Sequence, residues 1–478
     1  MLISPELETA DIQTLIFSGY PKLEASFHLL WVDDPATARR WLARLPVAYG
    51  NEDLEEGVHI AFTCAGLAAL GVDSEILGGF SLPFREGMRS EHRKRVLGDV
   101  GGNDPAEWLW GRPGVDEPEP SRVPDAILLV YAGEPEFASK GAAKLLSGPA
   151  GWRSHPLATP KNLRVEGRKP LKEHFGFDDG ISNPHIQGLG GEGMPHNTVA
   201  AGEFVLGYPN QLGQIPQSPH VPPGAPGGHV LSKGDLGRNG SYLVVRQLEQ
   251  RVRSFWEFVV KASGANTPEE ATRLAAKMVG RWPNGAPLAT WSMDPPPDAA
   301  AARSTSDDQF LYAGDPHGHA CPIGAHIRRT NPRDAVPLLD AGRSIAISKQ
   351  RRILRRGRAY GKTIEGWPDP AKIVQSQKDP DTGRGLHFLC FVADLERQYE
   401  FVQQTWINSR KFGGLANDAD PLLSNPDLPP DMPKASDFTI QREPVNRRII
   451  GLPSFVGVRG SAYFFMPGRR AIKYLSEI

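Results

Sequence analysis

Apolar and polar positions along the N-terminal third of the chain predict alternating strands and helices. The apolar run "ASFHLLWV" at 25–32 is typical of a strand, and "ATARRWLARL" at 36–45, after Asp34-Pro35, is typical of a helix. The other elements predicted for this third are a strand at 57–63, a short helix at 65–71, a Pro/Gly-rich loop at 101–123 and a strand at 125–133.

The C-terminal part also shows predicted strands that alternate with helices. Its predicted strands are 241–250, 385–394 and 461–467, and its predicted helices are 251–262 and 395–408, both with apolar residues at helical spacing. The Pro-rich segment 207–229 is too long for a simple turn, and such loops often carry function or wrap a ligand. The pattern favours an α+β protein with antiparallel sheets that carry helices on one face.

Composition narrows the class of protein. The 478 residues suggest two or three domains or one large internally duplicated unit. Lys+Arg (54) and Asp+Glu (55) nearly cancel, which argues against a nucleic-acid or polybasic membrane surface. The three cysteines form no CxxC pair, so a reducing compartment fits best. With neither a signal peptide nor a run of about 18 apolar residues visible, a cytoplasmic protein is expected, with no membrane partner.

Two adjacent aspartates stand out in "EHFGFDDGISNPHIQG" (173–188). Asp178 and Asp179 lie between glycines, with His174 and His185 on either side, so the pair can cap a helix, hold a metal or move a proton. The close pair His317 and His319 in "DPHGHA" is a weak metal signal, because no third ligand accompanies it; a polar loop is the simpler interpretation.

A single histidine is set apart by its surroundings. His326 ends a small apolar run in "CPIGAHIRRTNPRDA" and is followed by Arg328, Arg329 and Arg333. Such a histidine is usually a satisfied core residue. It also suits a haem, because the imidazole can hold the iron while guanidinium groups pair with the propionates.

The segment "RRILRRGRAYG" (351–361) holds five arginines around one aliphatic pair. A solvated basic strand or an anion site would explain it. Alternation along a strand can nevertheless turn one arginine inward, where an anion or a catalytic task must keep it. An aspartate, an axial histidine and an inward arginine together would suit cleavage of a bound peroxide, which needs a base for the proton and a cation for the developing charge.

These segments resemble the dye-decolorizing peroxidase family. Its GxxDG signature is met by Gly176-Phe177-Asp178-Asp179-Gly180, its proximal-histidine segment by "AHIRRTNPR" and its distal-arginine segment by "RILRRGRAYG". The similarity extends over nearly the whole chain, through "DIQTLI", "FTCAGLAALG", "RQLEQRVRSFWEF", "MVGRWPNGAPL", "GLHFLCFVADLERQYEFVQQTWIN" and "SAYFFMPG".

The resemblance implies roles for individual residues. Asp179 would be the distal proton acceptor, Arg355 the distal arginine and His326 the axial ligand of haem b. Asp420 would be the acidic partner of His326, with Asp418 and Glu396 as competitors for that place.

The resemblance also implies contacts around the haem. It places Leu386 and Phe388 on the apolar distal face, and gives Gly180, Ile181, Arg329 and Asn331 as further haem contacts. Tyr360 would match a tyrosine that passes electrons to bulky dyes at the surface, although a packing tyrosine explains it equally well. Asp178 would be a loop or capping residue.

The family also implies a fold and a reaction. The fold would consist of two ferredoxin-like halves of the dimeric α+β barrel-like type, divided here into residues 1–160 and a haem-carrying half, residues 161–478. The reaction would be reduction of hydrogen peroxide with oxidation of dyes, phenols and similar donors through a ferryl porphyrin radical. A non-peroxidatic haem-binding or iron-release protein of the same fold is the alternative, and a metal enzyme built on the aspartate pair is a second one. A monomer and a homo-oligomer are both compatible with the sequence.

Overall fold

The structure of the chain is a computed structural model. It describes most of the sequence, and the described residues are 6–51, 54–112, 122–148, 150–165, 171–190, 193–264, 267–295, 308–336, 338–376, 380–423, 425 and 437–478.

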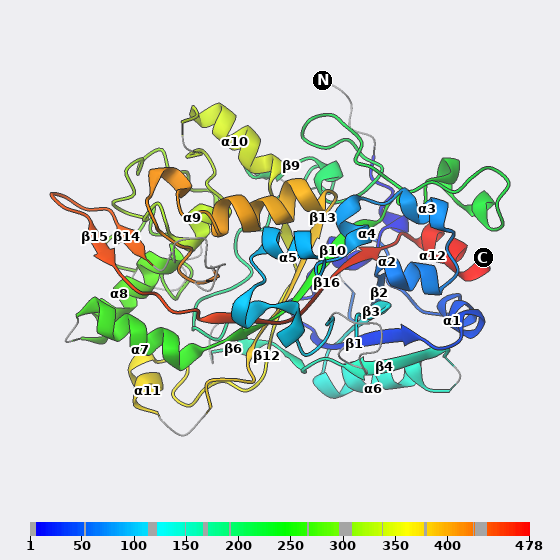
Figure 1. The fold of residues 1–478 in the computed structure, drawn as a ribbon, viewed down its shortest axis with the longest axis horizontal. Coiled ribbons are helices and arrows are strands. Elements are labelled where there is room, and N and C mark those ends of the chain that lie inside the picture. The colour runs from blue at the N-terminus through cyan, green and yellow to red at the C-terminus, as the bar shows by residue number, and fades with distance from the viewer. Residues whose placement is uncertain are drawn as a thin grey trace.

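One ten-stranded antiparallel sheet runs through the molecule (Figure 1). The strand order is β4-β1-β3-β2-β16-β10-β13-β12-β5, and β11 pairs with β13. The bounds are β1 Glu24–Val32, β2 Gly57–Phe62, β3 Ala126–Ala132, β4 Trp152–Pro156, β5 Pro160–Lys161, β10 Ser241–Gln250, β11 Leu354–Arg355, β12 Arg358–Tyr360, β13 Gly385–Val392 and β16 Val456–Met466. Six short strands form three two-stranded sheets: β6 Leu163–Arg164 with β7 Leu171–Lys172, β8 His185–Ile186 with β9 Thr198–Val199, and β14 Phe438–Ile440 with β15 Arg447–Ile449.

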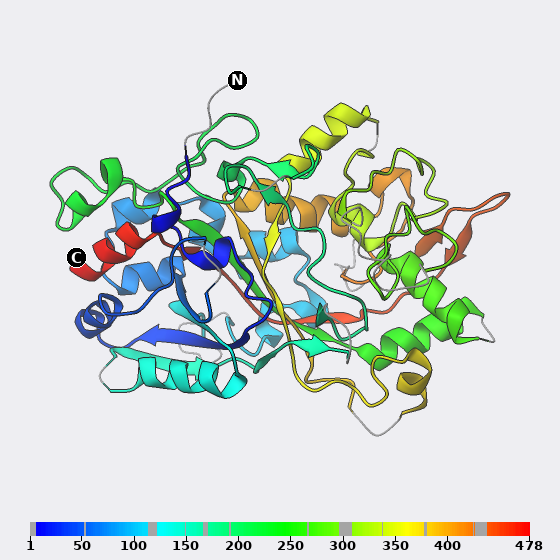
Figure 2. The same cartoon turned by 180° about the vertical axis from the view of Figure 1, so that it is seen from behind.

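Short helices surround both ends of this sheet. Those of the N-terminal part are α1 Pro35–Leu42, α2 Cys64–Ala69, α3 Ser74–Gly78, α4 Leu82–Glu86, α5 Glu91–Leu97 and α6 Pro135–Leu146. Those of the C-terminal part are α7 Val252–Ser263, α8 Pro268–Val279, α9 His326–Thr330, α10 Ala341–Gln350, α11 Pro370–Gln375 and α12 Arg469–Glu477, with π-helices η10 Leu395–Glu400 and η11 Val402–Ile407. Seen from behind, α6 lies along β1 in the N-terminal part (Figure 2).

Both faces of the sheet are buried, as the alternation along β3 shows. Leu128 and Val130 belong to one buried apolar cluster, whereas Leu129 and Tyr131 belong to a second one. Because successive side chains of a strand point to opposite faces, these two clusters are the two sides of the sheet. The sheet is therefore covered by helices and loops on both faces, whereas the sequence predicted helices on one face.

The two parts of the sheet meet at β2 and β16. Their pairing consists of Phe62 opposite Phe465. β2 comes from the N-terminal part of the sequence and β16 from its C-terminal end, so the sheet joins segments that are far apart in the chain. The α+β class is confirmed. The predicted division after residue 160 stays a prediction. β5 spans Pro160–Lys161, across that boundary, and pairs with β12 of the C-terminal part.

Local sequence explains where several elements begin. Asp34 caps α1 by accepting hydrogen bonds from the N–H groups of Ala36 and Thr37, and Pro35 occupies the first helical position. The helix ends at Leu42, three residues earlier than predicted. Segment 395–408, predicted as one helix, forms the two π-helical stretches.

Candidate active site

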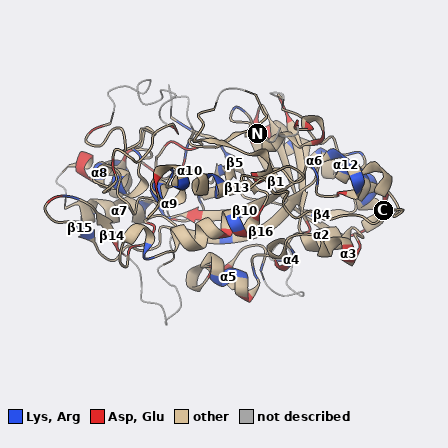
Figure 3. Cartoon of the chain, turned by 90° about the horizontal axis from the view of Figure 1, so that it is seen from above, with Lys and Arg blue, Asp and Glu red and all other residues tan. Residues whose placement is uncertain are grey.

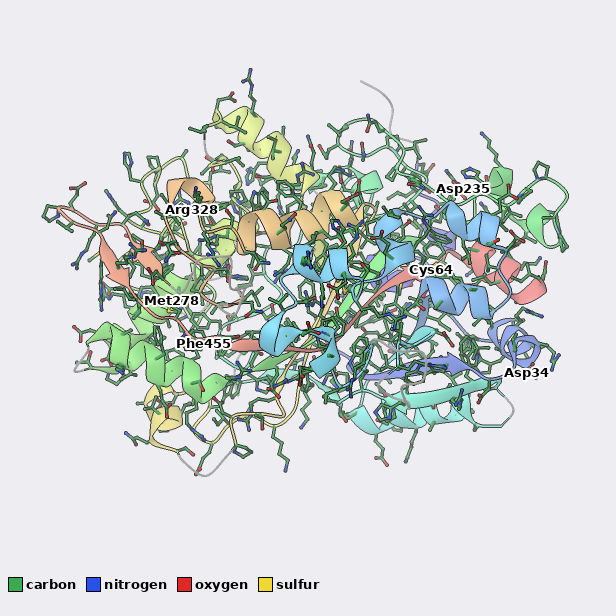
Figure 4. All side chains as sticks on the ribbon, in the orientation of Figure 1. Asp34, Cys64, Asp235, Met278, Arg328 and Phe455 are labelled. Atoms are coloured by element: carbon green, nitrogen blue, oxygen red, sulfur yellow. The ribbon has the colours of Figure 1, made fainter. Side chains whose placement is uncertain are left out.

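A cavity among the described residues lies between the sheet and a layer of helices. Its volume is about 290 Å³. One wall consists of alternate residues of β10 and β13, in which Leu248 lies opposite Leu386 and Arg246 opposite Phe388. These side chains share one face because they are two residues apart on paired strands. Figure 4 helps to locate the other wall, since Arg328 marks α9 and Met278 marks α8.

His326 enters the cavity from the first residue of α9. Its Nδ1 lies 3.0 Å from Oδ2 of Asp420, and its side chain is 22% exposed. The other carboxylate oxygen of Asp420 accepts hydrogen bonds from the N–H groups of Leu422 and Leu423. With Nδ1 directed at Asp420, Nε2 is the ring nitrogen that can meet a ligand in the cavity.

The surroundings of Asp420 favour its ionised form. Burial by itself raises the pKa of Asp420, but its attraction to His326, the hydrogen bond between them and the nearby Arg329 bring that pKa below its ordinary value. Of the two competing acids, Asp418 accepts hydrogen bonds from Thr439, and Glu396 lies 3.5 Å from Arg93. Asp420 is thus the acid that contacts His326.

Asp179 and Arg355 line the same cavity. Nη1 of Arg355 lies 3.7 Å from Oδ1 of Asp179, and both side chains are about one third exposed, at 35% and 31%. Arg355 lies on β11, and its main-chain N–H donates to Oδ1 of Asn183 at 3.0 Å. The Arg355 guanidinium also donates to the carbonyl oxygen of Ile181. The sequence-predicted aspartate and arginine therefore face each other.

Asp178 has different surroundings from its neighbour. Its carboxylate lies 2.7 Å from the Lys172 ammonium group, and the two side chains are 1% and 3% exposed. Lys172 also donates to the carbonyl oxygens of Gly176 and Pro283. Asp178 is an ion-paired loop residue, where the sequence suggested a loop or capping residue.

Arginines gather around Ser182 at one end of the cavity. Arg281 and Arg333 donate to the Ser182 hydroxyl, and Arg352 donates to the Ser182 carbonyl oxygen. Arg333 also lies 3.0 Å from Asp308. Burial, with Arg333 and Arg355 close by, lowers the pKa of Arg352 to about 9. Counting Arg355 and Asp179, four guanidinium groups face two carboxylates, a surplus of positive charge that suits an anionic ligand.

Several smaller predictions can be placed. Leu386, Phe388, Ile181 and Asn331 line the cavity. Gly180 lies between two lining residues and has φ +78°, a conformation that favours glycine, and its N–H donates to Asp179 Oδ1.

Two of the predicted residues are not among those that line the cavity, and their predicted roles stay predictions. Arg329, on α9, is fully buried and donates to the carbonyl oxygens of Gly324, Trp406 and Ser409. Tyr360 is 3% exposed and packs on His387. Tyr399 is the tyrosine that lines the cavity.

The second alternative drawn from the sequence, a metal enzyme, finds no support among the described residues. No group of three or more His, Cys, Asp or Glu side chains is arranged there to hold a metal ion. His174 is buried and contacts the Tyr360 carbonyl oxygen at 2.7 Å, while His317 and His319 are exposed on a loop.

Sequence reasoning missed Arg281 and Arg352. The backbone of residues 180–183 was predicted to contact haem, but nothing local marks Ser182 as a meeting point for arginines from three other segments. Arg352 belongs to the arginine-rich segment, whose outward and inward members could not be told apart without the strand register.

Known proteins resemble the chain over almost its whole length. Dye-decolorizing peroxidase AauDyP1 of Auricularia auricula-judae is 27% identical, covering 98% of this chain and 86% of the relative. A dye-decolorizing peroxidase of Mycena epipterygia is also 27% identical, covering 98% of this chain and 87% of the relative. A crystal structure of a decolorizing peroxidase from Auricularia auricula-judae matches with a TM-score of 0.78 at 25% identity, covering 98% of this chain and all of that one.

The chain is similar to dye-decolorizing peroxidases over nearly its whole length. Comparison with models of protein families gives no match. The ferredoxin-like α+β fold expected of a dye-decolorizing peroxidase is confirmed by the match to solved structures.

The cavity of the chain fits a haem. It offers one imidazole backed by a carboxylate, apolar side chains from the sheet, and clustered guanidinium groups at one end. These are the three things that a flat apolar macrocycle with an iron centre and two carboxylates requires.

Proposed function

We propose that this chain is a haem peroxidase that reduces hydrogen peroxide and oxidises dyes, phenols and similar aromatic one-electron donors. The observation that carries this proposal is that His326 with Asp420, and Asp179 with Arg355, line one cavity. An axial ligand and an acid–base pair in the same cavity are what peroxide cleavage needs.

The residues that would hold haem b follow from the cavity walls. His326 would ligate the iron through Nε2, and Asp420 would orient the ring and increase its basicity. Arg281, Arg333 and Arg352 around Ser182 would receive the propionates. When bound, haem supplies an iron centre that exchanges electrons with peroxide and donor.

Asp179 and Arg355 would handle protons and charge. Asp179 takes the proton from one peroxide oxygen and delivers it to the other, from which water leaves. Arg355, 3.7 Å away, stabilises negative charge on the departing oxygen. Leu386 and Phe388 keep this side of the cavity apolar and limit access to small molecules.

Haem-loading and peroxide experiments test the proposal directly. Purified protein titrated with haem should develop a Soret band, and peroxide should change that spectrum and support oxidation of an anthraquinone dye. A spectrum that does not respond to peroxide would favour the haem-carrier alternative. His326→Ala should lose tight haem binding, and a variant with unchanged haem affinity would remove His326 as the ligand.

The proposed setting is the cytoplasm. Cys64, Cys321 and Cys390 are all free thiols, which suits a reducing compartment. No helix among the described residues has the length and apolar character to cross a membrane.

A further inference from the structure

Asp179 is held in place mainly by its backbone. Its side chain approaches Arg355 at 3.7 Å and accepts the N–H of the next residue, Gly180. Its own N–H donates to the Leu171 carbonyl oxygen at 2.9 Å. The direction of its carboxylate therefore depends on this main-chain bond and on the turn that precedes it, residues 173–178.

That turn closes around a single partly buried carboxylate, that of Glu173. Oε2 of Glu173 accepts the N–H of Phe175 at 2.9 Å, and Oε1 accepts the N–H of Phe177 at 2.9 Å. The Glu173 N–H in turn donates to the Phe177 carbonyl oxygen at 3.0 Å, and the Gly176 N–H donates to the Glu173 carbonyl oxygen at 2.9 Å. Gly176, with φ +97°, lets the chain reverse within this short span.

The same carboxylate connects the turn to the sheet. Gln250, the last residue of β10, donates its side-chain N–H to Oε2 of Glu173. The ring of Phe175 packs against Phe255 of α7 at a centroid distance of 4.6 Å, and Trp256 donates to the Phe175 carbonyl oxygen. Glu173 itself lines the cavity. The turn is thereby fixed to β10, which forms one wall of the site, and to α7.

A carboxylate withdrawn from water is costly unless it has a task or strong partners. Desolvation raises the pKa of Glu173 to about 7, and the N–H groups of Phe175 and Phe177, one on each carboxylate oxygen, act against that rise. Such bonds are stronger when the carboxylate is ionised. We propose that Glu173 is a positioning residue, whose carboxylate clamps the backbone of residues 175–177 and so aims Asp179 into the cavity.

This inference rests on the proposed role of Asp179, so its test needs one readout that does not depend on peroxide. In Glu173→Gln, one oxygen acceptor is replaced by an N–H₂ group that faces a main-chain N–H. Glu173→Asp keeps the carboxylate but shortens it. Glu203→Gln is the matched control, since Glu203 is fully buried, accepts the Gln211 N–H and pairs with Arg397 elsewhere in the fold.

The first readout is amide hydrogen exchange of residues 175–177 in haem-loaded protein. Exchange should be about 10- to 100-fold faster in Glu173→Gln, the change expected from losing a hydrogen bond to a charged group. It should be intermediate in Glu173→Asp and unchanged at these residues in Glu203→Gln. Wild-type exchange in both Glu173 variants would overturn the clamp.

The second readout is the rate of the spectral change after peroxide is mixed with haem-loaded protein. Glu173→Gln should slow this step about 10-fold or more, with partial recovery in Glu173→Asp, while the later step with a phenolic donor keeps its wild-type rate. Faster exchange with an unchanged peroxide rate would overturn the positioning role. If wild-type protein itself does not react with peroxide, the proposed function fails, and the exchange data still decide whether Glu173 clamps the turn.

Discussion

At the scale of single residues, Asp178 and Asp179 show how neighbours in sequence acquire different chemistry. Asp178 is buried against Lys172, whereas Asp179 is about one third exposed and faces Arg355 across 3.7 Å. A group that exchanges protons with a small substrate has to be reachable, and a group that neutralises a buried lysine does not.

Replacing Asp179 should affect chemistry and leave the fold intact. In Asp179→Asn the peroxide reaction should slow by about 10²- to 10⁴-fold, the usual contribution of a positioned acid–base group. Rapid mixing of haem-loaded protein with peroxide measures the rate, and thermal unfolding should show a midpoint close to that of wild type. A variant with the wild-type rate would mean that another group moves the proton.

Replacing Asp178 should affect stability. Asp178→Asn leaves the Lys172 ammonium group buried with two carbonyl acceptors, and the free energy of unfolding should fall by about 3 kcal/mol. Urea unfolding measures this loss. A change below about 0.5 kcal/mol would show that the ion pair contributes little.

At the scale of elements, α9 is positioned by a loop that lies far from it in sequence. His326 begins this five-residue helix, and Asp420, from the segment after η11, receives its Nδ1–H. Such a short helix has little stability of its own. Its orientation depends on Asp420 and on Arg329, which ties α9 to the carbonyl oxygens of Trp406 and Ser409.

The two acids near α9 allow a paired comparison. Asp420→Asn should weaken haem binding about 10- to 100-fold, because the axial imidazole loses its charged partner. Asp418→Asn should leave haem affinity near the wild-type value, since Asp418 bonds to Thr439. Haem titration followed at the Soret band measures both; equal affinities for the two variants would contradict the assignment of Asp420.

The sequence predicts the long elements of this protein well and the site less completely. Strand 241–250 is found with the predicted bounds because its apolar residues mark it without tertiary context. α9 has too few residues to show a helical period; His326 was singled out by its neighbouring residues, and the family resemblance gave it the axial role. Arg281 and Arg352 reach Ser182 only after distant segments pack together, so no local pattern identifies them. Tyr360 could not be placed from sequence, because burial of a tyrosine depends on what covers it.

At the scale of the whole molecule, charge is evenly distributed. Acidic and basic segments are interspersed over the view in Figure 3, in keeping with a formal net charge of −1. The strongest concentration of one sign that concerns function is internal, in the arginines around Ser182. The stability of the fold also depends on buried ionisable groups, of which His59 is an example.

His59 should make the fold sensitive to acid. It is fully buried between Gln13 and Tyr20, and burial lowers its pKa to about 3. Above pH about 6.5 the histidine is neutral in both the folded and the unfolded chain. Below that pH the unfolded chain binds a proton that the folded chain excludes, so stability falls as the pH drops from about 6.5 towards 3.

Urea unfolding at a series of pH values isolates this contribution. In His59→Gln the loss of stability with falling pH should be smaller than in wild type by up to about 1.4 kcal/mol per pH unit over this window. His92→Gln, at an exposed position of α5, is the control and should keep the wild-type slope. Equal slopes for His59→Gln and wild type would mean that His59 becomes charged in the folded protein.

The position of β16 in the sheet has a consequence for how the protein is made. β16 lies between β2 and β10, yet it is synthesised after every other strand of that sheet. Until its residues leave the ribosome, β2 and β10 both present unpaired edges, the kind of surface that recruits other chains. Biosynthesis of this protein therefore includes an interval in which the two halves of the sheet are not yet joined by β16. Molecular chaperones would have their main opportunity to act during that interval.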